Sequence, residues 1–263
     1  MIPFMKSFFI VIFIALGAYL AVASNNTEIL ISYTEVCPFM CTQEKNRGFV
    51  TDIAEAVFTT AGYKVNFLAL PWARAISDIN SGKTDAIISA AKSEAPGLIF
   101  PSQEIAMQSD CIFGRKDDDW VPGEDVKSYK GRKTIVFSGW TKEIDFKKEL
   151  GQDEYDNRFQ HFSMDHTYLP RSIKMISLFR ADGFWMEPQV VQYFFKNGSD
   201  EKQKSEIKNL GCIKRQKLYI GFSPNKPELS KKLALQFDEG ITALRQNGKL
   251  KLILDKYNLK DWK

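Results

Sequence analysis

A closely joined helix and strand at residues 71–92 constrains the fold of this chain more than any other stretch. Apolar residues recur at helical spacing across residues 72–79, and Gly82 then supplies a signal for the end of that helix. The apolar run at residues 85–88 follows at once and suits a buried strand. Such a unit indicates an α/β sheet. Ligands of open α/β sheets bind beyond the carboxyl ends of the strands, so residues 89–92 form a candidate binding segment.

The alternation of strands and helices continues along the chain and is typical of parallel βαβ units. Strands are expected at 28–33, 64–70, 85–88, 134–137, 181–186 and 218–222, and helices at 48–58, 72–79, 142–150, 172–179, 190–195, 229–245 and 249–257. Residues 151–170 are polar and are expected to be irregular. The charged segment at 115–119 marks a candidate crossover between two domains.

The N-terminal segment has the pattern of an exported protein. Residues 1–6 form a short basic region, residues 8–20 an apolar region, and residues 21–23 a cleavage site of small residues. The apolar run is shorter than the roughly 20 residues that cross a bilayer. We therefore expect residues 1–23 to be a cleaved signal peptide rather than a membrane anchor, and the mature chain to be soluble.

The charge of the chain argues against nucleic acid as a partner. The sequence has 36 basic and 32 acidic residues, a formal net charge of +4. The two signs are interspersed, as at residues 201–208, which are expected to be solvated surface. The sequence also lacks the nucleophile-elbow, phosphate-loop and zinc-protease motifs. We expect no nucleic-acid partner, no catalytic residues and no cofactor.

Four cysteines lie in the part of the chain that is expected to be exported: Cys37, Cys41, Cys111 and Cys212. An oxidising compartment permits two disulfides, for which three pairings are possible. We favour Cys37 with Cys41 and Cys111 with Cys212. A metal site is the weaker interpretation, because no second ligand pair lies near Cys37 and Cys41 and the chain has only 2 histidines.

Six short motifs follow one another along the mature chain. They are Gly48-Phe49-x-x-Asp52-Ile53, Trp72-x-Arg74, Gly82-Lys83-x-Asp85-Ala86, Tyr129-Lys130-Gly131-Arg132-Lys133, Arg180-Ala181-Asp182-Gly183, and Gly248-Lys249-Leu250 with Tyr257. In this order they resemble the family 3 bacterial extracellular solute-binding proteins, over residues 28–262. The resemblance implies the type II periplasmic-binding fold, in which two α/β lobes joined by two hinge strands close over a ligand in the cleft between them.

The resemblance also implies where the lobes and their partners lie. Lobe 1 is expected to comprise residues 28–109 and 219–263, and lobe 2 residues 110–218. A Cys111–Cys212 bridge would then join the two crossover segments. The expected protein is a periplasmic monomer that holds a small polar molecule and passes it to an ABC permease in the inner membrane.

Charged candidates for the ligand site follow from the same resemblance. Amino-acid receptors of the family clamp the ligand carboxylate with an arginine beyond the strand that ends here near Ser89, but Glu94-Ala95 stands in the matching place. Lys92 or Arg74 could substitute, although lysine lacks the bidentate fork of arginine and Lys92 equally suits plain surface. Glu187 matches the acid that meets the ligand's ammonium group; it suits a cationic or hydroxylated ligand, with a surface glutamate as the alternative.

Aromatic and small residues complete the candidate site. Tyr33, Phe39, Trp72 and Trp140 stand at strand ends or loop starts, where rings can stack on flat or cationic ligands, although a place in the core is the alternative for each. Ser89, Ala90 and Lys92 form the polar segment after the strand. Thr141 begins a helix and offers its hydroxyl to a ligand, or else only caps the helix. Phe184 and Trp185 lie inside an apolar strand and are expected in the core.

Two other functions stay open at this point. A few relatives are cyclohexadienyl dehydratases, and in such an enzyme Glu187 would donate the proton, aided by Lys92 or Arg74. The other alternative is a sensor module that reports ligand binding to a membrane partner.

Overall fold

The computed structural model describes residues 27–43, 46–140, 142–198 and 201–263. The predicted signal peptide lies outside these residues. None of the helices in the described part of the chain is long and apolar enough to span a membrane.

The strands of the described residues form one eight-stranded sheet in the order β2-β1-β3-β8-β4-β7-β5-β6. They are β1 (Thr27–Tyr33), β2 (Tyr63–Ala69), β3 (Ala86–Ala90), β4 (Ala106–Arg115), β5 (Thr134–Phe137), β6 (Phe159–Phe162), β7 (Gly183–Met186) and β8 (Ile207–Phe222). β1 is parallel to β2 and β3, and β5 is parallel to β6 and β7. β4 and β8 run antiparallel to each other and to their outer neighbours.

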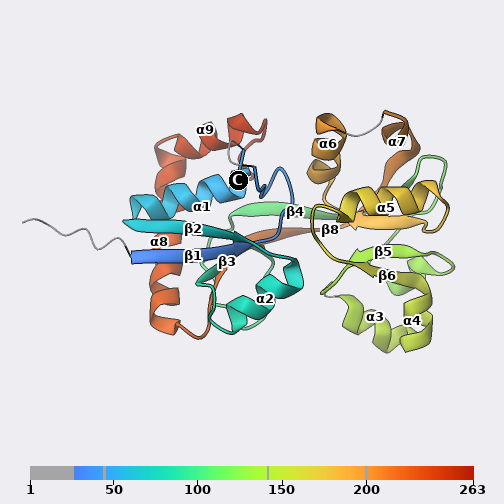
Figure 1. Ribbon diagram of the computed structural model, residues 1–263, viewed down its shortest axis with the longest axis horizontal. Helices are drawn as coiled ribbons and strands as arrows, with labels where there is room; N and C mark the ends of the chain where they lie inside the picture. Colours follow the sequence, from blue (N-terminus) through green and yellow to red (C-terminus); the bar gives the residue numbers. More distant parts are fainter. Residues whose placement is uncertain (1–26, 44–45, 141, 199–200) are drawn as a thin grey trace, which may run out of the picture.

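The two central strands join two lobes (Figure 1). We call lobe 1 the part built on β1–β3 and lobe 2 the part built on β5–β7. β8 enters the sheet of lobe 1 at residues 219–222, and β4 enters that of lobe 2 at residues 111–114. Between these points, residues 106–110 of β4 pair with residues 214–218 of β8. We call these ten paired residues the hinge segment; the exact lobe boundaries stay a prediction.

Helices cover both faces of each half of the sheet (Figure 1). They are α1 (Phe49–Thr60), α2 (Trp72–Asn80), α3 (Lys142–Leu150), α4 (Gln152–Arg158), α5 (Tyr168–Ser177), α6 (Pro188–Asn197), α7 (Glu201–Glu206), α8 (Pro227–Gln246) and α9 (Lys249–Lys256), with a 3-10 turn at Val126–Tyr129. In lobe 1, α1, α8 and α9 pack together, while α2 contacts β1 and β3. In lobe 2, α5, α6 and α7 lie on one side and α3 and α4 on the other.

Each lobe has its own aromatic core. The ring of Phe58 contacts those of Tyr63, Phe222 and Phe237 in lobe 1, and the ring of Phe159 contacts those of Tyr129, Trp140, Phe146 and Tyr155 in lobe 2. Because each half buries its own large apolar surface, each can stay compact while the other moves about the hinge segment.

The expectation of an irregular segment at residues 151–170 is wrong. α4 and β6 form within it, and α5 begins there. Tyr155 and Phe159 are buried and stack with ring centroids 4.8 Å apart, so two aromatic anchors hold a mostly polar helix and a short strand against lobe 2. Residues 201–208 were predicted only as solvated surface, and no helix or strand was expected there. The structure has α7 and the start of β8 in this segment.

Two disulfides lie in different parts of the fold. Cys37 pairs with Cys41 within the loop after β1, and Cys111 pairs with Cys212 across β4 and β8. These are the pairs that the sequence analysis favours. The second disulfide lies beside the hinge segment, on its lobe 2 side, and therefore joins the two strands on which the lobes would move.

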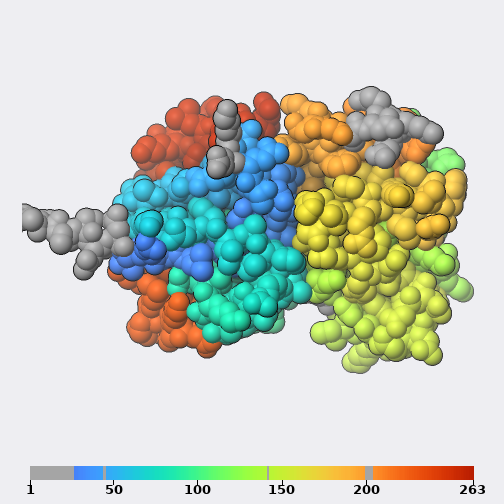
Figure 2. Space-filling model, in the orientation of Figure 1, coloured from blue at the N-terminus to red at the C-terminus, as the bar shows by residue number. Residues whose placement is uncertain are grey.

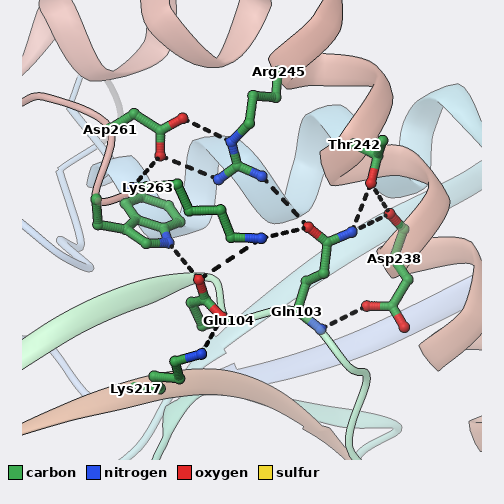
Figure 3. Close-up of polar contacts among 9 residues, drawn as sticks. Gln103, Glu104, Lys217, Asp238, Thr242, Arg245, Asp261 and Lys263 are labelled. Carbon is green, nitrogen blue, oxygen red and sulfur yellow. Dashed lines mark hydrogen bonds and ion pairs between the residues drawn. The ribbon is translucent and has the colours of Figure 1, made fainter.

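The last residues of the chain lie against the start of β4 (Figure 3). The guanidinium of Arg245 in α8 donates to both carboxylate oxygens of Asp261, at 2.7 and 3.1 Å. The Trp262 indole N–H and the Lys217 ammonium both reach Glu104, at 3.2 and 3.3 Å. Burial raises the pKa of Glu104, but its hydrogen bonds and Lys217 outweigh burial and leave that pKa lowered. The network fixes α8 to the strand that leads into the hinge segment.

We expect Asp261→Asn to lower the free energy of unfolding by about 1 kcal/mol at low salt, because it removes the negative partner of a bidentate, part-buried arginine. Asp255→Asn is the matched control, since Asp255 pairs with Lys251 on the exposed face of α9. Its loss should be about 0.3 kcal/mol. Urea unfolding of the two variants measures both values, and equal losses would contradict a special contribution from Asp261.

Candidate functional site

A pocket lies between the two lobes, and its free space, including the part open to solvent, is about 590 Å³. It is lined from lobe 1 by Thr34, Val36, Phe39, Met40, Trp72, Ile88, Ser89 and Glu94, from the hinge strands by Gln108 and Leu218, and from lobe 2 by Phe137, Met164, Trp185, Met186 and Glu187. Most of these residues stand at or just beyond the carboxyl ends of β1, β3, β5, β6 and β7, where α/β sheets bind ligands. Figure 2 shows the lobes meeting along a narrow seam.

The loop after β1 supplies one wall of the cavity. Its Phe39 ring packs on Phe49 of α1, with centroids 4.8 Å apart. Gly48 makes this approach possible: its φ is +95°, and a Cβ there would lie 2.2 Å from the backbone oxygen of Phe39. Glycine is therefore required at the start of α1 if Phe39 and Met40 are to reach the cavity.

The end of β3 supplies a second, strained wall. Ser89 has φ 65°, a left-handed conformation that is uncommon outside glycine. The pairing of β3 with β8 also shifts register between Ile87 and Ala90. The irregularity turns the Ser89 hydroxyl toward the Met40 sulfur, 3.0 Å away. Backbone strain of this kind is found at functional sites.

Trp72 connects the two lobes across the cavity. It is the first residue of α2 and is 8% exposed. A Cβ at Gly139, in the turn after β5, would lie 3.2 Å from the indole Cδ1 of Trp72. The ring therefore contacts the facing lobe directly and helps to close the cavity over whatever it holds.

Three carboxyl groups gather where the cavity meets the hinge segment. Glu187 follows β7, and its carboxylate accepts the backbone N–H of Ser109 in β4. Gln216 in β8 donates to Glu94 at 3.0 Å and, at 3.4 Å, to Asp110. Among the described residues, no lysine or arginine forms an ion pair with Glu94, Asp110 or Glu187. We call these three residues the acidic cluster.

Burial raises the pKa of every member of the acidic cluster. The pKa of Glu187 rises to about 7, that of Glu94 to about 7 and that of Asp110 to about 6. The charge of Asp110 adds to the shift at both glutamates, while Lys214 and Arg215 on β8 oppose it from a distance. The cluster lacks a close counterion and is therefore only partly ionised near pH 7.

The acidic cluster should make the ligand-free protein less stable as pH rises. The usual carboxyl pKa values are 4.5 for glutamate and 3.8 for aspartate, so between roughly pH 4.5 and pH 7 the folded state binds more protons than the unfolded state. We expect the free energy of unfolding to fall by about 5 kcal/mol from pH 5.5 to pH 8, of which about 2 kcal/mol comes from Glu187. Urea unfolding across this range tests it. Glu187→Gln should flatten the slope, and an unchanged slope in that variant would contradict the assignment.

Four of the residues predicted from sequence line the cavity: Phe39, Trp72, Ser89 and Glu187. Thr141 lies outside the described residues. The remaining five lie elsewhere. Tyr33 is buried against Phe67 in lobe 1, and Ala90 is fully buried in β3. Trp140 packs in the core of lobe 2 on Phe146.

The two predicted cations also lie away from the cavity lining. Arg74 donates to Asp78, four residues later on α2, at 2.9 Å and is otherwise exposed. The Lys92 ammonium lies 4.4 Å from the centroid of the Tyr219 ring, on the exposed side. As a result, no arginine, lysine or histidine is found among the described residues that line the cavity.

Several lining residues were not predicted from sequence. Trp185 is buried in the core, as expected, but it also lines the cavity, and its buried indole N–H has no partner among the described residues. Gln108 lies in β4, and the sequence does not show which side chains of this strand point toward the cavity. Met164 follows β6, in the segment expected to be irregular. Ile88, Phe137 and Met186 end predicted strands, and that position was a usable signal.

No group of three or more His, Cys, Asp or Glu in the described part of the chain could hold a metal ion.

Comparison with known proteins identifies a family and a fold. The sequence model of bacterial extracellular solute-binding proteins, family 3, matches residues 29–260. Among curated proteins, none matches the chain. The match confirms the resemblance carried by the six motifs.

Solved structures share the architecture. A histidine kinase sensor domain with similarity to periplasmic binding proteins has a TM-score of 0.69 at 18% identity, covering 89% of this chain and 98% of that one. An ABC uptake transporter substrate binding protein from Streptococcus pneumoniae, with bound histidine, has a TM-score of 0.69 at 18% identity, covering 89% and 94%. A putative L-cystine ABC transporter from Listeria monocytogenes has a TM-score of 0.66 at 16% identity, covering 88% and 95%. These likenesses confirm the type II periplasmic-binding fold.

Proposed function

Because the chain belongs to the bacterial extracellular solute-binding proteins of family 3, we propose that it is a periplasmic receptor that captures a small solute between its lobes. One observation carries this proposal: the cavity takes its walls from strand ends of both lobes and from the hinge segment between them. A solute there contacts both lobes at once, so its binding favours the closed arrangement. The predicted signal peptide and the two disulfides fit an exported protein.

Delivery of the solute to an ABC permease is the use that we propose. Two of the similar structures are described as ABC transporter proteins, and one of them holds histidine. The similar kinase sensor domain supports a second candidate, in which the closed protein signals to a membrane partner. Solute-dependent stimulation of ATP hydrolysis by a reconstituted permease supports delivery. Binding of the closed protein to a receptor ectodomain instead of a permease would favour sensing.

The chemistry of the cavity supports a receptor over a dehydratase of cyclic acids. Such a substrate carries carboxylates, which bind best to arginine or lysine. The cavity lining in the described part of the chain offers Glu94 and Glu187 and no cation. We therefore propose that Glu187 binds ligand rather than donating a proton in catalysis.

Thermal unfolding against a library of amino acids, amines, sugars and organic acids tests solute capture. A solute present at 100 times its dissociation constant should stabilise the protein by about 2.7 kcal/mol. Small-angle scattering with and without that solute then reports whether the lobes close. A library that produces no stabilisation at all would contradict the proposal.

A further inference from the structure

We infer that the cavity takes a small organic cation, a primary amine or quaternary ammonium compound that lacks a carboxylate. The inference rests on the proposed function, solute capture in this cavity, and names the chemical class of the solute. Three features of the cavity carry it: carboxylates without counterions, a wall of aromatic and methionine side chains, and the lack of a partner for a ligand carboxylate.

The carboxylates need a positive partner. Glu187 lines the cavity and is 6% exposed, yet it has no ion pair among the described residues. A buried carboxylate without a counterion is costly, and it can be stabilised by a proton or by a cation. Glu94 accepts from Gln216 and the Ala91 N–H, and Glu187 from Ser109, so each keeps free lone pairs for further donors. An ammonium group between them would supply both charge and hydrogen bonds.

The rest of the lining suits the apolar body of such a cation. The rings of Phe39, Trp72 and Phe137 come from three different elements and enclose the space from both lobes. Aromatic faces attract ammonium and quaternary ammonium groups, more so when water is excluded. Met40 and Met164 add polarisable surface that adapts to the shape of a ligand.

A ligand carboxylate would find only repulsion here. The two cations predicted for the site are held elsewhere, Arg74 by Asp78 and Lys92 by the ring of Tyr219. Lys217, next to the lining residue Leu218, pairs with Glu104. A carboxylate placed beside Glu94 and Glu187 would bring like charges together in a poorly solvated space. The cavity therefore selects against zwitterionic amino acids while it keeps affinity for their decarboxylated amines.

Matched ligand pairs test this inference on the unaltered protein. Each pair differs by one carboxylate: agmatine and arginine, tyramine and tyrosine, histamine and histidine, cadaverine and lysine, and choline and glycine betaine. Isothermal calorimetry at pH 7.5 measures both members of each pair. For every pair in which either member binds, we expect the cation without a carboxylate to bind at least tenfold more tightly.

The outcomes separate the inference from the proposed function. If an amino acid or glycine betaine binds as tightly as its partner, or if only neutral or anionic solutes bind, the inference is overturned and solute capture stands. If nothing in the pairs or in the wider solute library binds, both are overturned. Tenfold preference for the cations, together with competition between choline and the preferred amine, supports both and locates the two ligands in one site.

Discussion

Replacing Glu187 with glutamine is expected to weaken the binding of the preferred cation roughly 100-fold, which corresponds to about 2.7 kcal/mol. The glutamine keeps the size of the side chain, and its carbonyl oxygen can still accept the Ser109 N–H that the carboxylate accepts now. The variant loses the negative charge, and one acceptor oxygen becomes an NH2 group. Because this charge is buried and faces the cavity, its interaction with an ammonium group is far less screened than that of a surface pair. Calorimetry with agmatine and choline measures the loss.

Two controls make this result specific. Glu228→Gln removes an equally negative but exposed side chain of α8 and should change the affinity less than twofold. Unfolding of the Glu187 variant at pH 8 should show no loss of stability, because the variant no longer holds an uncompensated buried charge. Wild-type affinity in a folded Glu187→Gln protein would mean that this carboxylate does not face the ligand's charge.

Local signals were sufficient to predict most of the elements. The helix at residues 72–79 and the strand after it are found as α2 and β3, because helical spacing, a stop at Gly82 and an apolar run lie within one short stretch. The first part of β8 was not predicted, because it lacks such local signals. Lys208, Lys214 and Arg215 give it the composition of solvated surface, and only the pairing with β4 makes it a strand.

The residues of the candidate site that could be predicted are those whose position at the end of a strand was sufficient to place them. Glu187 and Ser89 stand at strand ends, and the sequence therefore places them at the correct edge of the sheet. Ala90, the residue after Ser89, does not line the cavity, because successive side chains of a strand point to opposite faces. The sequence could have predicted that Arg74 does not face the cavity. Asp78 lies four residues later on the same helix, which is the spacing of an ion pair within a helix.

The acidic cluster could not have been predicted. Asp110, Glu94 and Glu187 lie in separate elements, and Gln216 joins two of them from the β8 strand of the hinge segment. Two registers help to bring them together: β4 against β8 places Gln108 opposite Gln216, and β4 against β7 places Cys111 opposite Met186, next to Glu187. Register between distant strands is a tertiary property, and no local pattern in this chain encodes it.

Removing the Cys111–Cys212 disulfide should produce the largest loss of stability, about 3 kcal/mol, in a Cys111→Ala, Cys212→Ala variant. The two cysteines are 101 residues apart, and the loop that they close contains all of lobe 2 built on β5–β7. A cross-link that closes so long a loop restricts the unfolded chain strongly. Urea unfolding followed by tryptophan fluorescence measures the loss, since Trp140 and Trp185 report on lobe 2.

The second disulfide provides the matched control and a contrast in function. Cys37 and Cys41 are only 4 residues apart, so their replacement by alanine should cost less, about 2 kcal/mol of unfolding free energy. It should instead weaken ligand binding, because this disulfide fixes the loop that presents Phe39 to the cavity. Equal stability losses in the two double variants would contradict the argument from loop length. The expected pattern assigns one disulfide to the stability of lobe 2 and the other to the shape of the site.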